Sequence, residues 1–148
     1  MHEPIIKSEL RINNILFWLC FLITLIAIFM ALLSFFSRGV YPPSQIGMFY
    51  VGILIIYALH KEAIRFLDKS KIKKGNKKGE FFVYLWIIIT AGLYLIDFLT
   101  KNYYSISETG EKLNSIVQIS FIALEVGAIF ILARILKLIM IKIFQKNE

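Results

Sequence analysis

The sequence predicts an all-α protein that crosses a membrane four times, as an antiparallel four-helix bundle with both termini cytoplasmic. Three observations lead to this fold class. Apolar residues make up 58% of the 148 residues, more than the roughly 45–50% found in soluble domains. They gather in four long runs, each close to the ~20 residues that cross a bilayer as a helix. The basic residues gather on one side of the resulting four-pass chain.

The first span is expected at 15–36, a run with no ionisable side chain except the thiol of Cys20. A helix of this length measures roughly 33 Å, against ~30 Å for the hydrocarbon core. The run exceeds the ~7–15 apolar residues of a signal peptide, so we expect it to be retained. Small and polar residues recur along it at spacings of three and four, which predicts a seam for close helix packing. The seam consists of Cys20, Thr24, Ala27, Ala31 and Ser34.

The second span is expected at 41–60. Pro42 and Pro43 suit a turn before a helix better than a helix interior, and Ser44 can cap the helix that follows. The helical pattern continues beyond residue 60 through charged residues. The end of this helix is therefore expected to enter water.

The third and fourth spans are expected at 81–100 and 113–133. Each contains one acidic residue, Asp97 near the end of the third and Glu125 near the middle of the fourth. The two outer connections are short, which favours antiparallel neighbours in a bundle.

The orientation follows from the basic residues that flank the spans. Two precede the first span, eight lie in the loop at 61–80 and four lie in the tail at 134–148, against one in the first outer loop and two in the second. The positive-inside rule places the larger set of fourteen in the cytoplasm. We therefore expect one integral membrane domain, 1–148, in the cell or cytoplasmic membrane.

Glu125 is the centre of a candidate intramembrane polar site. It lies twelve residues into the fourth span, where a carboxylate is costly, so we expect it to face the bundle interior and to be paired or protonated. Asn114, Gln118 and Ala128 share its helix face, and Asp97 is a further member of the site. One hypothesis is a proton- or cation-coupled site in a transporter or channel. The other is a polar clamp that fixes helix packing.

A second candidate site lies at the outer rim of the bundle. Arg38 follows the first span and Asp97 lies one turn from the end of the third, so both are expected at a similar level and are predicted to form an ion pair. Trp86, Thr90 and Tyr94 share the helix face of Asp97, which suggests a packed or water-lined side. The alternative for Asp97 is a solvated interfacial carboxylate.

The loop at 61–80 is predicted to attract anionic lipid headgroups at the cytoplasmic face, at ~1 kcal/mol per charge near the surface. The candidate contacts are Lys69, Lys71, Lys73, Lys74, Lys77 and Lys78. The alternative is that these lysines only orient the chain. In either case the net charge of +7 is largely a topology signal, and nucleic-acid binding is not expected.

The sequence contains no enzyme motif. His2 and His60 show no metal-ligand spacing, and the single cysteine cannot form an internal disulfide or a cysteine-based metal site. No catalytic activity, metal or cofactor is therefore expected. The favoured function is a non-enzymatic accessory or assembly subunit of a membrane complex, whose partner is another membrane protein or a second copy. The alternatives are a small oligomeric proton- or cation-coupled transporter or channel that uses Glu125, and a holin-like pore former.

Overall fold

The computed structural model describes residues 3–42, 46–67 and 80–146. In these ranges the protein is helical and contains no strand. Each of its four long helices includes a stretch that is long and apolar enough to cross a membrane. The predicted all-α fold with four apolar helices is therefore confirmed. The elements are α1 (Glu3–Phe36), α2 (Ile46–Leu67), α4 (Glu80–Leu99), the short 3-10 helix η2 (Tyr103–Ser105) and α5 (Ser115–Lys146).

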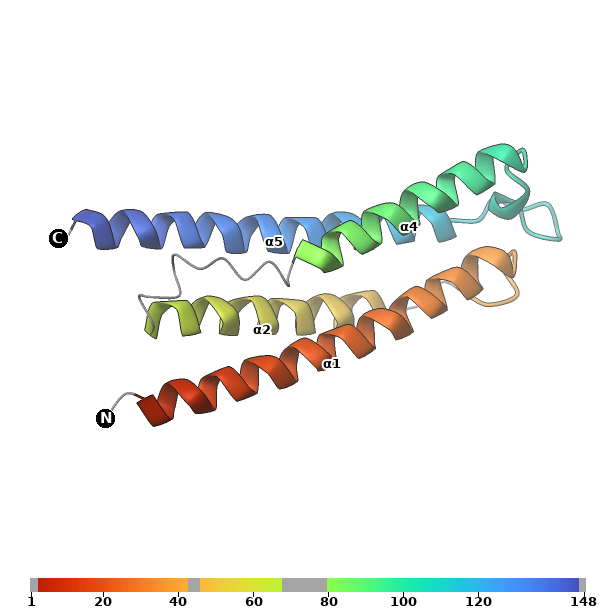
Figure 1. The fold of residues 1–148 in the computed structure, drawn as a ribbon. Helices are drawn as coiled ribbons and strands as arrows, with labels where there is room; N and C mark the ends of the chain where they lie inside the picture. The colour runs from red at the N-terminus through yellow and green to blue at the C-terminus, as the bar shows by residue number, and fades with distance from the viewer. Residues whose placement is uncertain (1–2, 43–45, 68–79, 147–148) are drawn as a thin grey trace.

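The helices lie along one long axis, and consecutive helices run in opposite directions, so that both chain ends lie at the same end of the molecule (Figure 1). Contacts between helix ends agree with this course. Ser34, near the end of α1, donates to the hydroxyl of Ser115, which begins α5, over 3.3 Å. Helix α2 packs against both α1 and α5, and α4 packs against α5. The pair α2 and α5 thus forms the centre of the bundle.

Helices α1 and α5, with 34 and 32 residues, are much longer than the predicted spans. Helix α1 starts at Glu3, with Pro4 in its first turn, where the missing N–H costs nothing. Neither proline nor glycine occurs between Pro4 and the end of α1, so nothing in the sequence stops the helix before the predicted start of the span. Helix α5 likewise continues through most of the predicted tail, as far as Lys146. The predicted cap Ser44 lies outside the described residues.

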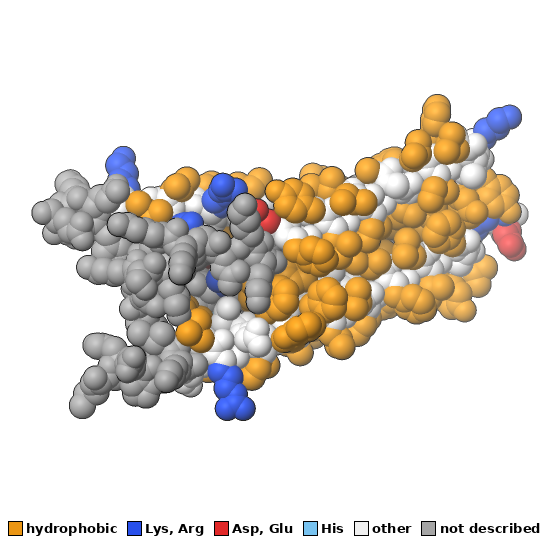
Figure 2. Space-filling model, viewed as in Figure 1, with side chains coloured by type: hydrophobic (Ala, Val, Ile, Leu, Met, Phe, Trp, Pro, Cys, Tyr) orange, Lys and Arg blue, Asp and Glu red, His pale blue; other side chains and the backbone are white. Residues whose placement is uncertain are grey.

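The outer surface of the bundle is apolar along most of its length. On the face seen in Figure 2, hydrophobic side chains cover the middle of the molecule, and the described charged side chains lie toward its two ends. Large apolar residues are exposed on every helix, among them Trp18, Met48, Ile88 and Leu124. Monomeric soluble proteins rarely expose apolar patches beyond a few hundred Å². The surface therefore agrees with the membrane class that the helix lengths indicate.

The packing seam predicted on α1 is confirmed, because all five of its residues are buried. Small side chains let helix backbones approach closely, and at this seam α1 meets α2. The thiol of Cys20 lies 3.8 Å from the carbonyl oxygen of Ile53 in α2. Ala27 and Ala31 continue the seam toward Ser34, which reaches α5.

A chain of hydrogen bonds joins three helices in the core. The indole Nε1–H of Trp86 in α4 donates to the hydroxyl oxygen of Tyr50 in α2 over 2.8 Å. The oxygens of Tyr50 and Thr24 in α1 are 3.1 Å apart, and Thr24 donates its hydroxyl hydrogen to the carbonyl of Cys20 over 2.6 Å. Because Thr24 has one hydroxyl hydrogen, that of Tyr50 completes the bond between them. Trp86, Tyr50 and Thr24 are fully buried, so the chain satisfies polar groups that water cannot reach.

We predict that Tyr50→Phe lowers the free energy of unfolding by about 1–2 kcal/mol, because it leaves the buried indole N–H of Trp86 without an acceptor. The measurement is reversible unfolding in mixed detergent micelles, followed by helical circular dichroism. Tyr84→Phe is the matched control, since Tyr84 is 59% exposed on α4. Equal losses in the two variants would contradict this assignment.

Candidate functional site

Glu125 lies on the outer surface of α5. The buried face of this helix consists of Ile116, Ile119, Ala123 and Val126, whereas Glu125 is exposed. At about 100° per residue, Glu125 is roughly 200° around the helix from Ala123. Among the described residues none forms a hydrogen bond or an ion pair with its carboxylate. Within one copy of the chain, this carboxylate therefore faces out of the bundle.

The prediction that Glu125 faces the bundle interior is wrong. Gln118 and Ala128, which share the helix face of Glu125 by their spacing, are exposed as Glu125 is, and Asn114 is exposed directly before α5 begins. This helix face lies outside because the opposite, aliphatic face of α5 fills the core instead. Asp97, the fourth predicted member of this site, is buried near the end of α4 and belongs to a different cluster.

Glu125 is nevertheless close to the middle of its span. At one end α5 begins with Ser115. Toward the other end, Arg134 lies 3.6 Å from the carboxylate of Glu80, the first residue of α4. Glu125 is ten residues from Ser115 and nine from Arg134, which corresponds to ~15 Å and ~13.5 Å along the helix. A bilayer core of ~30 Å would place it near the midplane.

Asp97 anchors the loop that connects α4 to α5. One carboxylate oxygen accepts the backbone N–H of Ser105 over 3.1 Å, and the other accepts the Ser105 hydroxyl over 2.6 Å. Asp97 is only 7% exposed, so these bonds compensate a carboxylate that is largely removed from water. The alternative of a solvated carboxylate therefore does not hold for Asp97.

Arg38 anchors the same loop from the end of α1. Its Nε donates to the carbonyl oxygens of Tyr103 and Ile106 over 3.1 and 3.0 Å, and Nη2 donates to that of Ser107 over 3.2 Å. The guanidinium carbon also lies 4.0 Å from the centre of the Tyr103 ring, a cation–π contact. Arg38 has a positive φ of 52°, which few non-glycine residues adopt. Its multiple bonds hold it in this conformation.

The predicted ion pair between Arg38 and Asp97 is wrong, since no salt bridge joins the two within the described part of the chain. Both residues lie at the same rim, as predicted. Each of them binds the segment Tyr103–Ser107 and not the other residue. The reason is that the backbone of this segment offers an N–H to the acid and carbonyl oxygens to the base.

The loop itself is a small hairpin. Ile106 pairs with Lys112 in an antiparallel bridge, and the N–H of Ser107 donates to the carbonyl of Glu111 over 2.8 Å. Gly110 turns the chain with a φ of 86°, a conformation that favours glycine. This hairpin was not predicted from the sequence, although Gly110 between polar residues is a turn signal.

The α4 face shared by Trp86, Thr90, Tyr94 and Asp97 divides into two parts. Trp86, Thr90 and Asp97 are buried, which agrees with a packed side. Tyr94 is exposed, and its hydroxyl is hydrogen-bonded to that of Ser120 of α5, with 3.0 Å between the two oxygens. The Trp86 bond to Tyr50 was also missed, because an aromatic residue in a span has no sequence mark that distinguishes a core role from an interfacial one.

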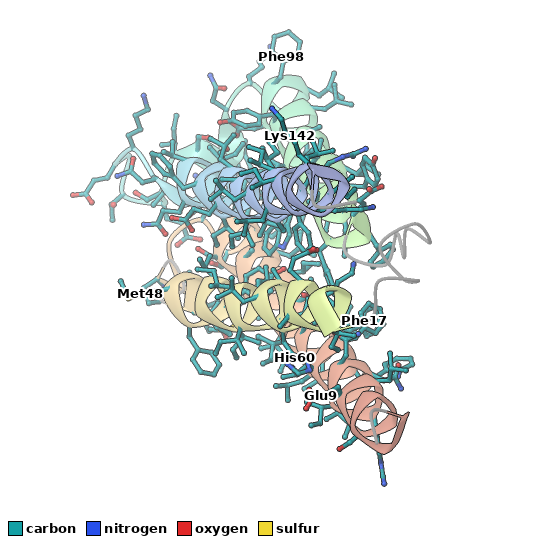
Figure 3. The ribbon with its side chains drawn as sticks, turned by 90° about the vertical axis from the view of Figure 1, so that its left-hand side faces the viewer. Glu9, Phe17, Met48, His60, Phe98 and Lys142 are labelled. Atoms are coloured by element: carbon teal, nitrogen blue, oxygen red, sulfur yellow. The ribbon has the colours of Figure 1, made fainter. Side chains whose placement is uncertain are left out.

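The opposite end of the bundle carries further charged residues. Glu9 of α1 and His60 of α2 point toward one another (Figure 3), with 3.6 Å between carboxylate oxygen and Nε2. Within the described ranges, no three His, Cys, Asp or Glu side chains are arranged to hold a metal ion. The candidate lipid contacts Lys69, Lys71, Lys73, Lys74, Lys77 and Lys78 lie outside the described residues.

Comparisons with protein-family models, with curated proteins and with solved structures give no match to this chain.

We predict that Arg38→Asp and Asp97→Arg each destabilise the protein by about 1–3 kcal/mol, because each leaves backbone groups of the loop without their partner. The double swap is expected to be no more stable than either single variant, since the new side chains would not match the loop N–H and carbonyls. Unfolding in mixed micelles measures the loss of stability, and the rate of trypsin cleavage after Lys112 measures the release of the loop. Lys101→Ala is the control for the loss of an exposed loop charge. Recovery of stability in the double swap would restore the ion-pair hypothesis.

Proposed function

We propose that this chain is a non-enzymatic accessory or assembly subunit of a membrane complex, which binds another transmembrane segment through the outer face of α5. One observation carries the proposal: Glu125 lies at mid-span on the outside of the bundle. An acidic side chain exposed to lipid at the bilayer centre costs roughly 2.5–3.5 kcal/mol on insertion scales. A partner helix that covers the carboxyl group removes that cost.

The packing of the core supports an accessory role over transport. The polar groups of Thr24, Tyr50 and Trp86 are bonded to one another, and the same buried core contains the packed rings of Phe82 and Tyr57. The acidic residue that a coupled transporter would use is not part of this interior. For the alternative, a small oligomeric transporter, a path along Glu125 would have to form between copies rather than within one.

The proposed topology is an antiparallel bundle with both termini in the cytoplasm. Its support is the count of fourteen basic residues against three and the position of both chain ends at one end of the molecule (Figure 1). The proposed partners at this face are anionic lipid headgroups, attracted by the lysines of the loop at 61–80.

To test the proposed role, we would reconstitute the protein in liposomes that contain a pH-sensitive dye and impose a pH gradient. We expect the wild type and Glu125→Gln to show the proton leak of protein-free liposomes, because the mid-span acid Glu125 faces out of the bundle and the core network of Thr24, Tyr50 and Trp86 contains no acid. A flux present in the wild type and absent in Glu125→Gln would instead establish the transporter. An added protonophore verifies that the gradient and the dye respond.

To test the topology, single cysteines are introduced in a Cys20→Ala background and labelled in intact cells with a membrane-impermeant maleimide. Thr109→Cys, in the exposed hairpin, is expected to react from outside. Ser8→Cys, near the start of α1 and also exposed, is expected to react only after the cells are permeabilised. The reverse pattern would invert the proposed orientation.

A further inference from the structure

We propose that the partner of the outer face of α5 is a second copy of this chain, and that two α5 helices pair in parallel with Glu125 facing Glu125. This inference rests on the proposed function and specifies its partner. The surface concerned, here named the α5 seam, consists of exposed residues that follow one another in steps of three and four. They are Gln118, Phe121, Glu125, Ala128, Leu132 and Ile135.

The spacing of the α5 seam is that of a helix-pairing surface. Gln118, Glu125 and Leu132 are seven residues apart, and Phe121, Ala128 and Ile135 repeat the same interval three residues later. A seven-residue repeat of this kind keeps one stripe facing a partner helix in a left-handed pair. The stripe extends to Lys142, which projects from α5 on the side away from α2 (Figure 3). It therefore covers more than three heptads, the length at which a heptad pattern becomes informative.

The two polar residues of the α5 seam are self-complementary. A protonated carboxylic acid has both a donor and an acceptor, and so does a carboxamide. Two copies inserted with the same orientation are related by a two-fold axis along the membrane normal, so each residue on the facing stripe meets its own counterpart. Glu125 then pairs with Glu125, and Gln118 pairs with Gln118 two helical turns away. Between them, Phe121 and its counterpart fill the interface.

The charge distribution favours parallel over antiparallel pairing of the two α5 helices. An antiparallel pair of α5 helices could place Glu125 beside Arg134 of the second copy, but one copy would then have to insert upside down. The fourteen basic residues on one side against three on the other oppose that insertion. Ala128, next to Glu125 on the stripe, lets the backbones approach closely enough for the carboxyl groups to meet.

The experiment is oxidative cysteine cross-linking in native membranes, in the Cys20→Ala background. Ala128→Cys lies on the α5 seam, six residues from Arg134. The matched control is Ile87→Cys, 52% exposed on α4 and seven residues from Glu80, at nearly the same depth. We expect Ala128→Cys to give a disulfide-linked dimer and Ile87→Cys to remain a monomer. Absence of the dimer, or an equal dimer yield from Ile87→Cys, overturns the proposal.

Two substitutions then test the role of the carboxyl group. Glu125→Gln is expected to keep the Ala128→Cys dimer, because an amide also donates and accepts. Glu125→Leu is expected to reduce the dimer about tenfold without loss of helical content or thermal stability, since Glu125 has no bond to the described residues of its own bundle. An undiminished dimer in Glu125→Leu overturns the assignment of Glu125 to the contact.

The same experiment separates this inference from the proposed function. If Ala128→Cys cross-links only to a protein of a different mass, self-pairing is wrong, whereas binding through the α5 face stands. If Ala128→Cys forms no cross-link at all and the native protein extracts as a monomer, both are wrong.

Discussion

Hydrocarbon contains no water to satisfy a polar group, and the arrangement of this protein follows from that constraint. The hydroxyl of Tyr50 is the point where α1, α2 and α4 meet, because it accepts from Trp86 and bonds Thr24. This chain of hydrogen bonds ends at the carbonyl oxygen of Cys20, so each of the three side-chain N–H and O–H groups in it has an acceptor. A bond network of this kind orients three helices at once, since each donor must point at one acceptor. The small residues of α1 then allow the backbones to close around it.

The predicted apolar spans contain two acidic residues, Asp97 and Glu125, whose carboxylates lie in opposite environments. Asp97 is buried and is fully occupied by the loop that it anchors. Glu125 has no such partner among the described residues of its own copy and lies on the outer surface. The first is therefore explained by stability alone, whereas the second needs something beyond the single chain. The proposed binding surface therefore lies on α5 and not at the cluster of Arg38 and Asp97.

What the sequence could predict was local, and what it could not predict depended on neighbouring helices. Long apolar runs specify helices of membrane-spanning length, and the spacing of Cys20 to Ser34 placed these residues on one buried face. The stripe of Gln118 and Glu125 was equally visible. Spacing shows which residues share a face, but the direction of that face is set by the rest of the bundle. The partners of Arg38 could not be predicted either, because backbone carbonyls are present at every residue and leave no mark in the sequence.

The position of Arg38 also has a consequence for biosynthesis. Its guanidinium binds carbonyl oxygens that lie 65 to 69 residues later in the chain. When the first hairpin of helices leaves the ribosome, these carbonyls have not yet been made, and chains are completed from the N-terminus onward. In the proposed topology, the Arg38 guanidinium is therefore solvated by water or lipid headgroups until α4 and α5 have inserted. In the proposed topology, the loop between α4 and α5 therefore closes onto Arg38 only after all four helices have entered the membrane.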